Sequence, residues 1–153
     1  MNFKRILIAT VVVTIVNALF GWLTCGWLFN WVYQLEPVNV WIAEAEMTPT
    51  FMLWANLGSL VIAFLFVLIF ARLQDCLPGK CRCCRGISYG VIVWLLGVLP
   101  GMFSIYMFMN INKTVPIYLA LSGLVRMLIL GGITGLIVNK KVEGESCCCG
   151  SGK

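Results

Sequence analysis

The dominant pattern along the chain is four long apolar stretches separated by short polar segments. The stretches cover about residues 6–29, 51–73, 87–109 and 115–138. Roughly 20 residues of α-helix, at 1.5 Å per residue, cross a hydrocarbon core of about 30 Å, so each stretch is long enough to span a membrane. The pattern predicts an all-α, polytopic membrane protein with four transmembrane helices in two antiparallel hairpins. Residues 1–141 form the predicted membrane domain and residues 142–153 a flexible, cysteine-rich tail.

Individual residues indicate where these helices begin, bend and lie next to one another. Thr48 and Pro49 are typical of a helix N-cap followed by a first-turn proline, so the second helix should begin there. Pro100 removes a backbone donor within the third helix and predicts a kink. The third and fourth helices should be antiparallel neighbours, because their connection is very short. Val38, Trp41, Ile42 and Ala45 recur at helical spacing, which predicts a short helix on the outer membrane surface over residues 38–46, with a plain loop as the alternative.

The charges predict the orientation of the chain in its membrane. Basic residues gather at three places: Lys4 and Arg5; Arg72, Lys80, Arg82 and Arg85; Lys140, Lys141 and Lys153. The other two loops contain Glu36, Glu44 and Glu46, and then only Lys113. The positive-inside bias places both termini and the 74–86 loop in the cytoplasm. The net charge of +5 therefore indicates membrane topology, with the lipid bilayer as the partner and no role for nucleic acid.

Small residues recur at helical spacing in three of the stretches and predict helix-packing faces. Glycine, alanine and serine let helix backbones approach closely in a membrane. The predicted faces are Ala55, Ser59 and Ala63; Gly90, Gly97, Gly101 and Ser104; and Gly131 with Gly135.

The first stretch has a polar stripe instead. It consists of Thr10, Thr14, Asn17, Gly21 and Thr24, which fall on one side of an α-helix. Lipid offers these groups no hydrogen-bond partner, so the stripe should face other helices. It is either an ordinary packing surface or part of a polar path through the bundle.

Arg126 lies near the middle of the fourth stretch, where an arginine costs at least about 2.5 kcal/mol to insert. All six acidic residues lie in loops or the tail, so no carboxylate shares its depth. The candidate partners within the membrane are Asn17, Ser59 and Ser122, together with backbone carbonyls. Otherwise the partner is a second chain, a lipid phosphate or an anionic ligand.

Gly131 and Gly135 lie about 140° and 180° around the helix from Arg126. Two opposed specialised faces suggest that this helix contacts protein on both sides. We therefore expect a homo-oligomer or a partner subunit, with the glycine face at the second contact.

Seven of the eight cysteines fall on the predicted cytoplasmic side. They are Cys76, Cys81, Cys83, Cys84, Cys147, Cys148 and Cys149. The cytoplasm is reducing, which disfavours structural disulfides, and clustered thiolates suit soft ions such as copper, zinc or mercury. S-acylation beside the basic residues is one alternative, and the absence of any specific role is another. No other cofactor is expected.

An enzyme is not expected from these residues. The chain has no histidine, hence no imidazole for acid–base catalysis or metal binding. No carboxylates are paired within the apolar stretches. The remaining function classes are a structural or accessory membrane component, a soft-metal handling or transport protein, and a pore with Arg126 in its wall.

The chain resembles small four-helix membrane proteins of bacteria. The matching features are the MNFKR start, Gly21-Trp22, Pro100-Gly101 and the glycine-rich last helix that ends in NKK. The resemblance spans about residues 1–141, whereas the cysteine-rich loop and the CCC tail depart from it. It implies a four-helix fold in the inner membrane and no assigned activity, which favours the structural or accessory role.

Overall fold

The computed structural model describes residues 3–28, 31, 35, 48–79, 81–109 and 111–138. Within these residues the regular elements are all helical. They are α1 (Phe3–Leu23), η1 (Thr24–Leu28), α2 (Pro49–Leu73), α3 (Arg82–Val93), η5 (Trp94–Val98), α4 (Leu99–Phe108) and α5 (Thr114–Val138), where η denotes a π-helical turn. They join into 4 helices that are long and apolar enough to cross a membrane. The predicted all-α, four-helix architecture is confirmed.

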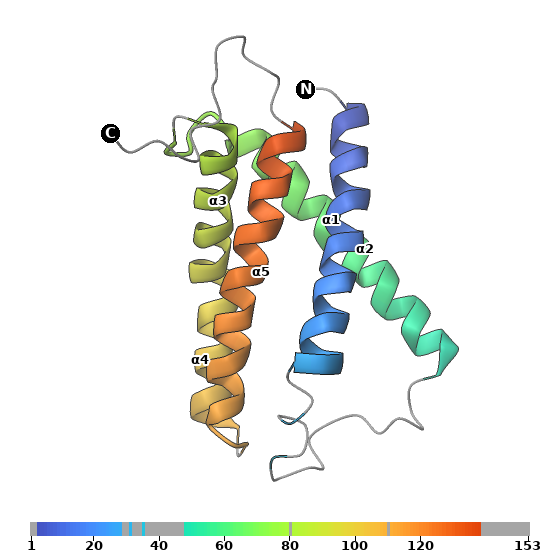
Figure 1. Cartoon of the computed structure of the whole chain (residues 1–153), viewed down its shortest axis with the longest axis vertical. Helices are drawn as coiled ribbons and strands as arrows, with labels where there is room; N and C mark the ends of the chain where they lie inside the picture. Colours follow the sequence, from blue (N-terminus) through green and yellow to red (C-terminus); the bar gives the residue numbers. More distant parts are fainter. Residues whose placement is uncertain are drawn as a thin grey trace.

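The helices form an uneven bundle in which α5 occupies the central position (Figure 1). On one side of α5 lies the continuous rod of α3, η5 and α4, and on the other side lies α1. The third and fourth apolar stretches are therefore antiparallel neighbours, as predicted. Helix α2 crosses the bundle obliquely, so its first half diverges from the other helices.

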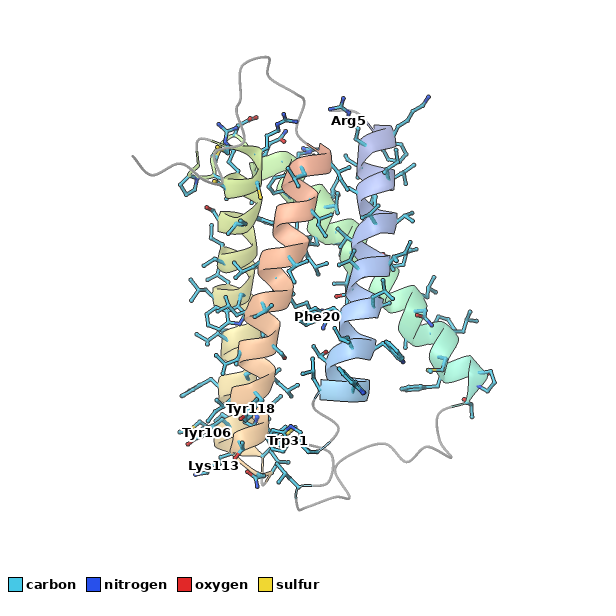
Figure 2. All side chains as sticks on the ribbon, viewed as in Figure 1. Arg5, Phe20, Trp31, Tyr106, Lys113 and Tyr118 are labelled. Atoms are coloured by element: carbon cyan, nitrogen blue, oxygen red, sulfur yellow. The ribbon has the colours of Figure 1, made fainter. Side chains whose placement is uncertain are left out.

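The two ends of the bundle differ in chemistry. We call the end that contains Arg5 and the α2–α3 connection the basic end (Figures 1 and 2). At the opposite, aromatic end, the ring of Trp31 meets Tyr118 edge-on at 5.1 Å, and the Lys113 ammonium lies 5.3 Å from the centre of the Tyr106 ring (Figure 2). Aromatic side chains of this kind favour the headgroup level of a bilayer. The predicted surface helix at 38–46 lies outside the described residues.

Helices α3 and α5 touch backbone to backbone through glycines. Gly86 and Gly90 of α3 lie against Gly131 and Gly135 of α5. A methyl group added at Gly135 would lie 2.5 Å from the Arg82 carbonyl oxygen, and one added at Gly131 would overlap the Gly86 carbonyl. Only hydrogen fits at these positions, which is why glycine occupies both helices along this contact.

Helix α3 begins at Arg82, whereas the sequence predicted its start at about residue 87. The chain turns at Gly79, whose φ of +146° suits glycine. Two hydrogen bonds then fasten the turn to the helix: Arg85 Nε donates to the Gly79 carbonyl at 3.1 Å, and Ser88 Oγ donates to the Pro78 carbonyl at 3.1 Å. The first turn of α3 was missed because it is polar, and apolar length alone does not detect such a turn.

Pro100 is accommodated by the π-helical turn η5. The Leu99 N–H donates to the Trp94 carbonyl, five residues earlier, so the helix widens just before the proline. The extra residue rotates everything that follows by about 100°. The prediction that Gly97 and Gly101 share a packing face with Gly90 is therefore wrong. A methyl group at either position would meet nothing within 4 Å among the described residues.

A second contact joins α1, α2 and α5 in the half of the bundle nearer the basic end. Its buried side chains are Ile6, Ala9 and Val13 from α1, Ala63, Val67 and Ala71 from α2, and Leu130 from α5. Ala63 thus packs as predicted. At the opposite end of α2, Thr48 Oγ1 accepts a hydrogen bond from the Phe51 N–H at 3.3 Å, which confirms the predicted N-cap.

The glycine contact gives a test of the fold. We expect Gly131→Ala to lower the free energy of unfolding by about 1–3 kcal/mol, because the added methyl overlaps the α3 backbone. Gly101→Ala adds the same methyl in open space and should change stability by no more than about 1 kcal/mol. Equilibrium unfolding in mixed micelles measures both variants. Equal changes in the free energy of unfolding for the two variants would contradict the close backbone contact between α3 and α5.

Candidate functional site

The site that gathers polar residues within the bundle is a groove of about 400 Å³ between α1, α2 and α5. It exists because α2 diverges from the other two helices in its first half (Figure 1). The buried contact around Val13 and Leu130 limits the groove on the side of the basic end. The lining residues are Val13, Asn17, Trp54, Ala55, Gly58, Ser59, Ile62, Ala63, Phe66, Arg126, Met127 and Leu130.

Three half-buried polar side chains form a hydrogen-bonded chain in the groove wall. Arg126 Nε of α5 donates to Asn17 Oδ1 of α1 at 2.5 Å. Asn17 Nδ2 in turn donates to Ser59 Oγ of α2 at 3.3 Å. We call Arg126, Asn17 and Ser59 the polar cluster. It connects all three helices that form the groove and brings together three of the four residues predicted from the sequence.

Asn17 is well suited to the middle of this cluster, because an amide both accepts and donates. Its oxygen receives the guanidinium N–H while its nitrogen reaches Ser59. The amide is neutral, so the hydrogen bond orients the Arg126 guanidinium without changing its charge. The groove wall therefore combines a fixed positive charge with apolar and small side chains, which is an arrangement that can bind an anionic group.

Ser122 does not join the polar cluster. Its hydroxyl donates to the Leu119 carbonyl of its own helix at 3.2 Å. The hydroxyls of Thr10 and Thr14 likewise donate to carbonyls one turn earlier in α1, at 2.9 Å and 2.8 Å. The helix itself satisfies these groups, which favours the packing interpretation of the stripe over a polar path.

The position of Gly131 and Gly135 corrects one expectation. Helix α5 does contact protein on both sides, as its two opposed faces predicted. However, the partner on the glycine face is α3 of the same chain, so the prediction that this face contacts a second protein is wrong. A bundle in which each helix has one inward face would leave the glycine face to a second protein, whereas α5 lies between two neighbours of its own chain (Figure 1).

Four of the cysteines predicted to bind metal lie in the α2–α3 connection and the first turn of α3. Cys76 is exposed in the α2–α3 connection, Cys81 precedes α3, and Cys83 and Cys84 lie in its first turn. Cys83 and Cys84 are therefore helical residues and not loop residues. The described residues contain no group of three or more potential ligands placed to hold a metal ion. Residues 147–149 lie outside the described part, so a thiolate site that combines the four cysteines of residues 76–84 with Cys147, Cys148 and Cys149 stays a prediction.

A second hollow of about 470 Å³ lies between α4 and α5 toward the aromatic end. Its lining is almost wholly apolar: Leu99, Pro100, Met102, Phe103, Tyr106, Pro116, Ile117 and Ala120. Lipid chains satisfy such a surface without any specific ligand. The groove with the polar cluster is therefore the candidate functional site.

The three residues of the polar cluster were among those predicted from the sequence, whereas Gly58 and Trp54 in the groove wall were not. Gly58 lies one residue from the predicted face of Ala55, Ser59 and Ala63, and a methyl group there would meet nothing within 4 Å. Helical spacing could have grouped it with Ala55. The divergence of α2 opens the groove, and the spacing of residues along the sequence does not predict it.

No protein-family model, no curated protein and no solved structure matches this chain. The assignment of a function therefore depends on the geometry of the groove itself.

A double-mutant cycle tests the polar cluster. We expect Asn17→Leu and Arg126→Leu each to change stability, and the pair to show a coupling energy of about 0.6–1.7 kcal/mol, typical of hydrogen bonds between membrane helices. Unfolding of the two single variants and the double variant in mixed micelles gives this value. As a control, Ser122→Ala combined with Asn17→Leu should show no coupling. A coupling energy near zero for Asn17 and Arg126 would contradict the hydrogen bond between them.

Proposed function

We propose that this chain is a non-enzymatic accessory component of the inner membrane that binds a second membrane protein, either another copy or a partner subunit. The single observation that supports the proposal is the groove beside the divergent half of α2. It exposes small residues of α2 and the charged side chain of Arg126 at one place. Polar and ionisable groups within membrane spans mark functional sites because they are costly to insert.

The groove has the character of an incomplete helix contact. Glycine and alanine are residue types that commonly pack against another helix in a membrane. Here a methyl group at Gly58 would meet nothing within 4 Å, and Ala55 is exposed. Toward the basic end the same face of α2 continues into the buried contact at Ala63 and Val67. A second chain would extend that contact along the groove.

A pore within a single chain is less well supported. The contact formed by Ile6, Val13, Val67 and Leu130 occupies the space between α1, α2 and α5 toward the basic end, and these side chains are at most 4% exposed. The groove is therefore limited at about mid-height of the bundle in the described residues.

We further propose that the basic end faces the cytoplasm, so that both termini lie there. Lys4, Arg5, Arg72, Arg82 and Arg85 belong to this end by their positions in the helices, whereas Lys113 belongs to the aromatic end. The bias of basic residues toward the cytoplasmic side supports this orientation.

Binding at the groove can be tested with a pair of glycines. Gly58→Trp places a large side chain in the groove. Gly97→Trp places the same side chain at a position of η5 that is also open, and η5 belongs to the rod on the other side of α5 (Figure 1). We expect only Gly58→Trp to convert complexes isolated in mild detergent to the single chain, measured by size-exclusion chromatography with light scattering. A single chain in the unmodified protein, or unchanged complexes for Gly58→Trp, would contradict the proposal.

The orientation can be tested by thiol labelling. In a variant whose only cysteine is Cys76, a membrane-impermeant maleimide should label the protein in disrupted cells and not in intact cells. A cysteine-free variant with Lys113→Cys should instead be labelled in intact cells. Labelling of Cys76 in intact cells would reverse the proposed orientation.

A further inference from the structure

The positive charge of Arg126 in the groove wall indicates which charge a bound molecule should carry. Arg126 is a permanent cation held by Asn17 in the groove wall. Opposite charges attract far more strongly in a medium of low dielectric than in water. An occupant that presents an anionic group at the depth of Arg126 is therefore favoured over a neutral one.

The shape of the α2 wall indicates that the occupant is a helix. Ala55, Gly58, Ser59 and Ala63 leave a low surface on which the backbone of another helix can lie closely. The lining of α2 extends from Trp54 to Phe66, which is about 18 Å of helix at 1.5 Å per residue. This length matches several turns of a second helix. A flexible lipid chain gains little from such a low, straight surface.

A second copy of this chain cannot supply the anionic group. Its acidic residues are Glu36, Glu44, Glu46, Asp75, Glu143 and Glu145, and all lie outside the four spans. Arg126 lies at the middle of α5, about 18 Å from either end of that helix. A carboxylate presented to Arg126 at this depth would therefore belong to a different protein.

We propose that the groove binds a transmembrane helix of a different protein that carries an aspartate or glutamate near its midpoint. The carboxylate lies against the Arg126 guanidinium, and the backbone of the partner helix lies against Ala55, Gly58 and Ser59. This proposal rests on the proposed function and specifies the chemistry of the partner. It makes Arg126 a recognition residue and Asn17 the residue that positions it.

The test uses a synthetic helix of defined sequence as the partner. The probe is an alanine- and leucine-rich span of about 20 residues with one central glutamate, and its control has glutamine there. Both are reconstituted with the full-length protein in phosphatidylcholine vesicles, and association is measured by energy transfer between labels. We expect the glutamate probe to bind about tenfold more tightly than the glutamine probe.

Variants of the protein separate charge from shape. Arg126→Gln keeps a polar side chain near Asn17 and should bind both probes equally. Gly58→Trp keeps the charge but fills the groove and should weaken both probes. Arg126→Glu should bind a probe with a central arginine better than the unmodified protein does, which a merely structural role of Arg126 would not produce. Circular dichroism of each variant establishes that the helices are intact.

Two results would overturn the proposal. The first is equal binding of the glutamate and glutamine probes to the unmodified protein. The second is binding of oleate or phosphatidylglycerol that depends on Arg126 and fully displaces the glutamate probe, which would make an anionic lipid the occupant. In either case, loss of the native complex in Gly58→Trp would still support binding of a second membrane protein at the groove. The proposal about the acidic partner helix can therefore fail while the proposed function stands.

Discussion

The backbone contact between α3 and α5 is the constraint on which the rest of this structure depends. Gly86 and Gly90 on one helix and Gly131 and Gly135 on the other leave no room for a side chain between them. In a membrane the hydrophobic effect does not drive helices together, so association depends on close van der Waals contact and hydrogen bonds. The glycine faces provide that contact and hold α5 in the middle of the bundle.

The central position of α5 determines where the polar chemistry lies. Because its glycine face is occupied by α3, the opposite face of α5 points toward α1, and Arg126 meets Asn17 there. Helix α2 packs against α1 and α5 mainly through its second half, where Ala63, Val67 and Ala71 are buried, and Ser59 of its first half accepts a hydrogen bond from Asn17. Its first half diverges, which leaves the polar cluster in the wall of an open groove (Figure 1). The proposed binding of another membrane helix follows from this arrangement.

Much of the fold could be predicted from apolar length alone, because a membrane span needs a minimum number of residues. The N-cap at Thr48 was also predictable, since it depends on neighbouring residues. Errors arose where the chain departs from a uniform, apolar α-helix. The start of α3 was placed too late because its polar first turn is stabilised by bonds to Pro78 and Gly79. Gly97 and Gly101 were assigned to a packing face because uniform α-helical spacing takes no account of a π-helical turn.

The sequence by itself determined that the chain has four apolar helices and that Arg126 lies deep within one of them. It also limited the possible side-chain partners of Arg126 within the membrane to Asn17, Ser59 and Ser122. These properties depend on residue type and on spacing along one helix. Only the tertiary structure decided that the glycine face of α5 contacts α3 of the same chain and that α2 diverges to form the groove. Both depend on how closely particular backbones approach one another, and the periodicity of a single helix carries no information about that distance.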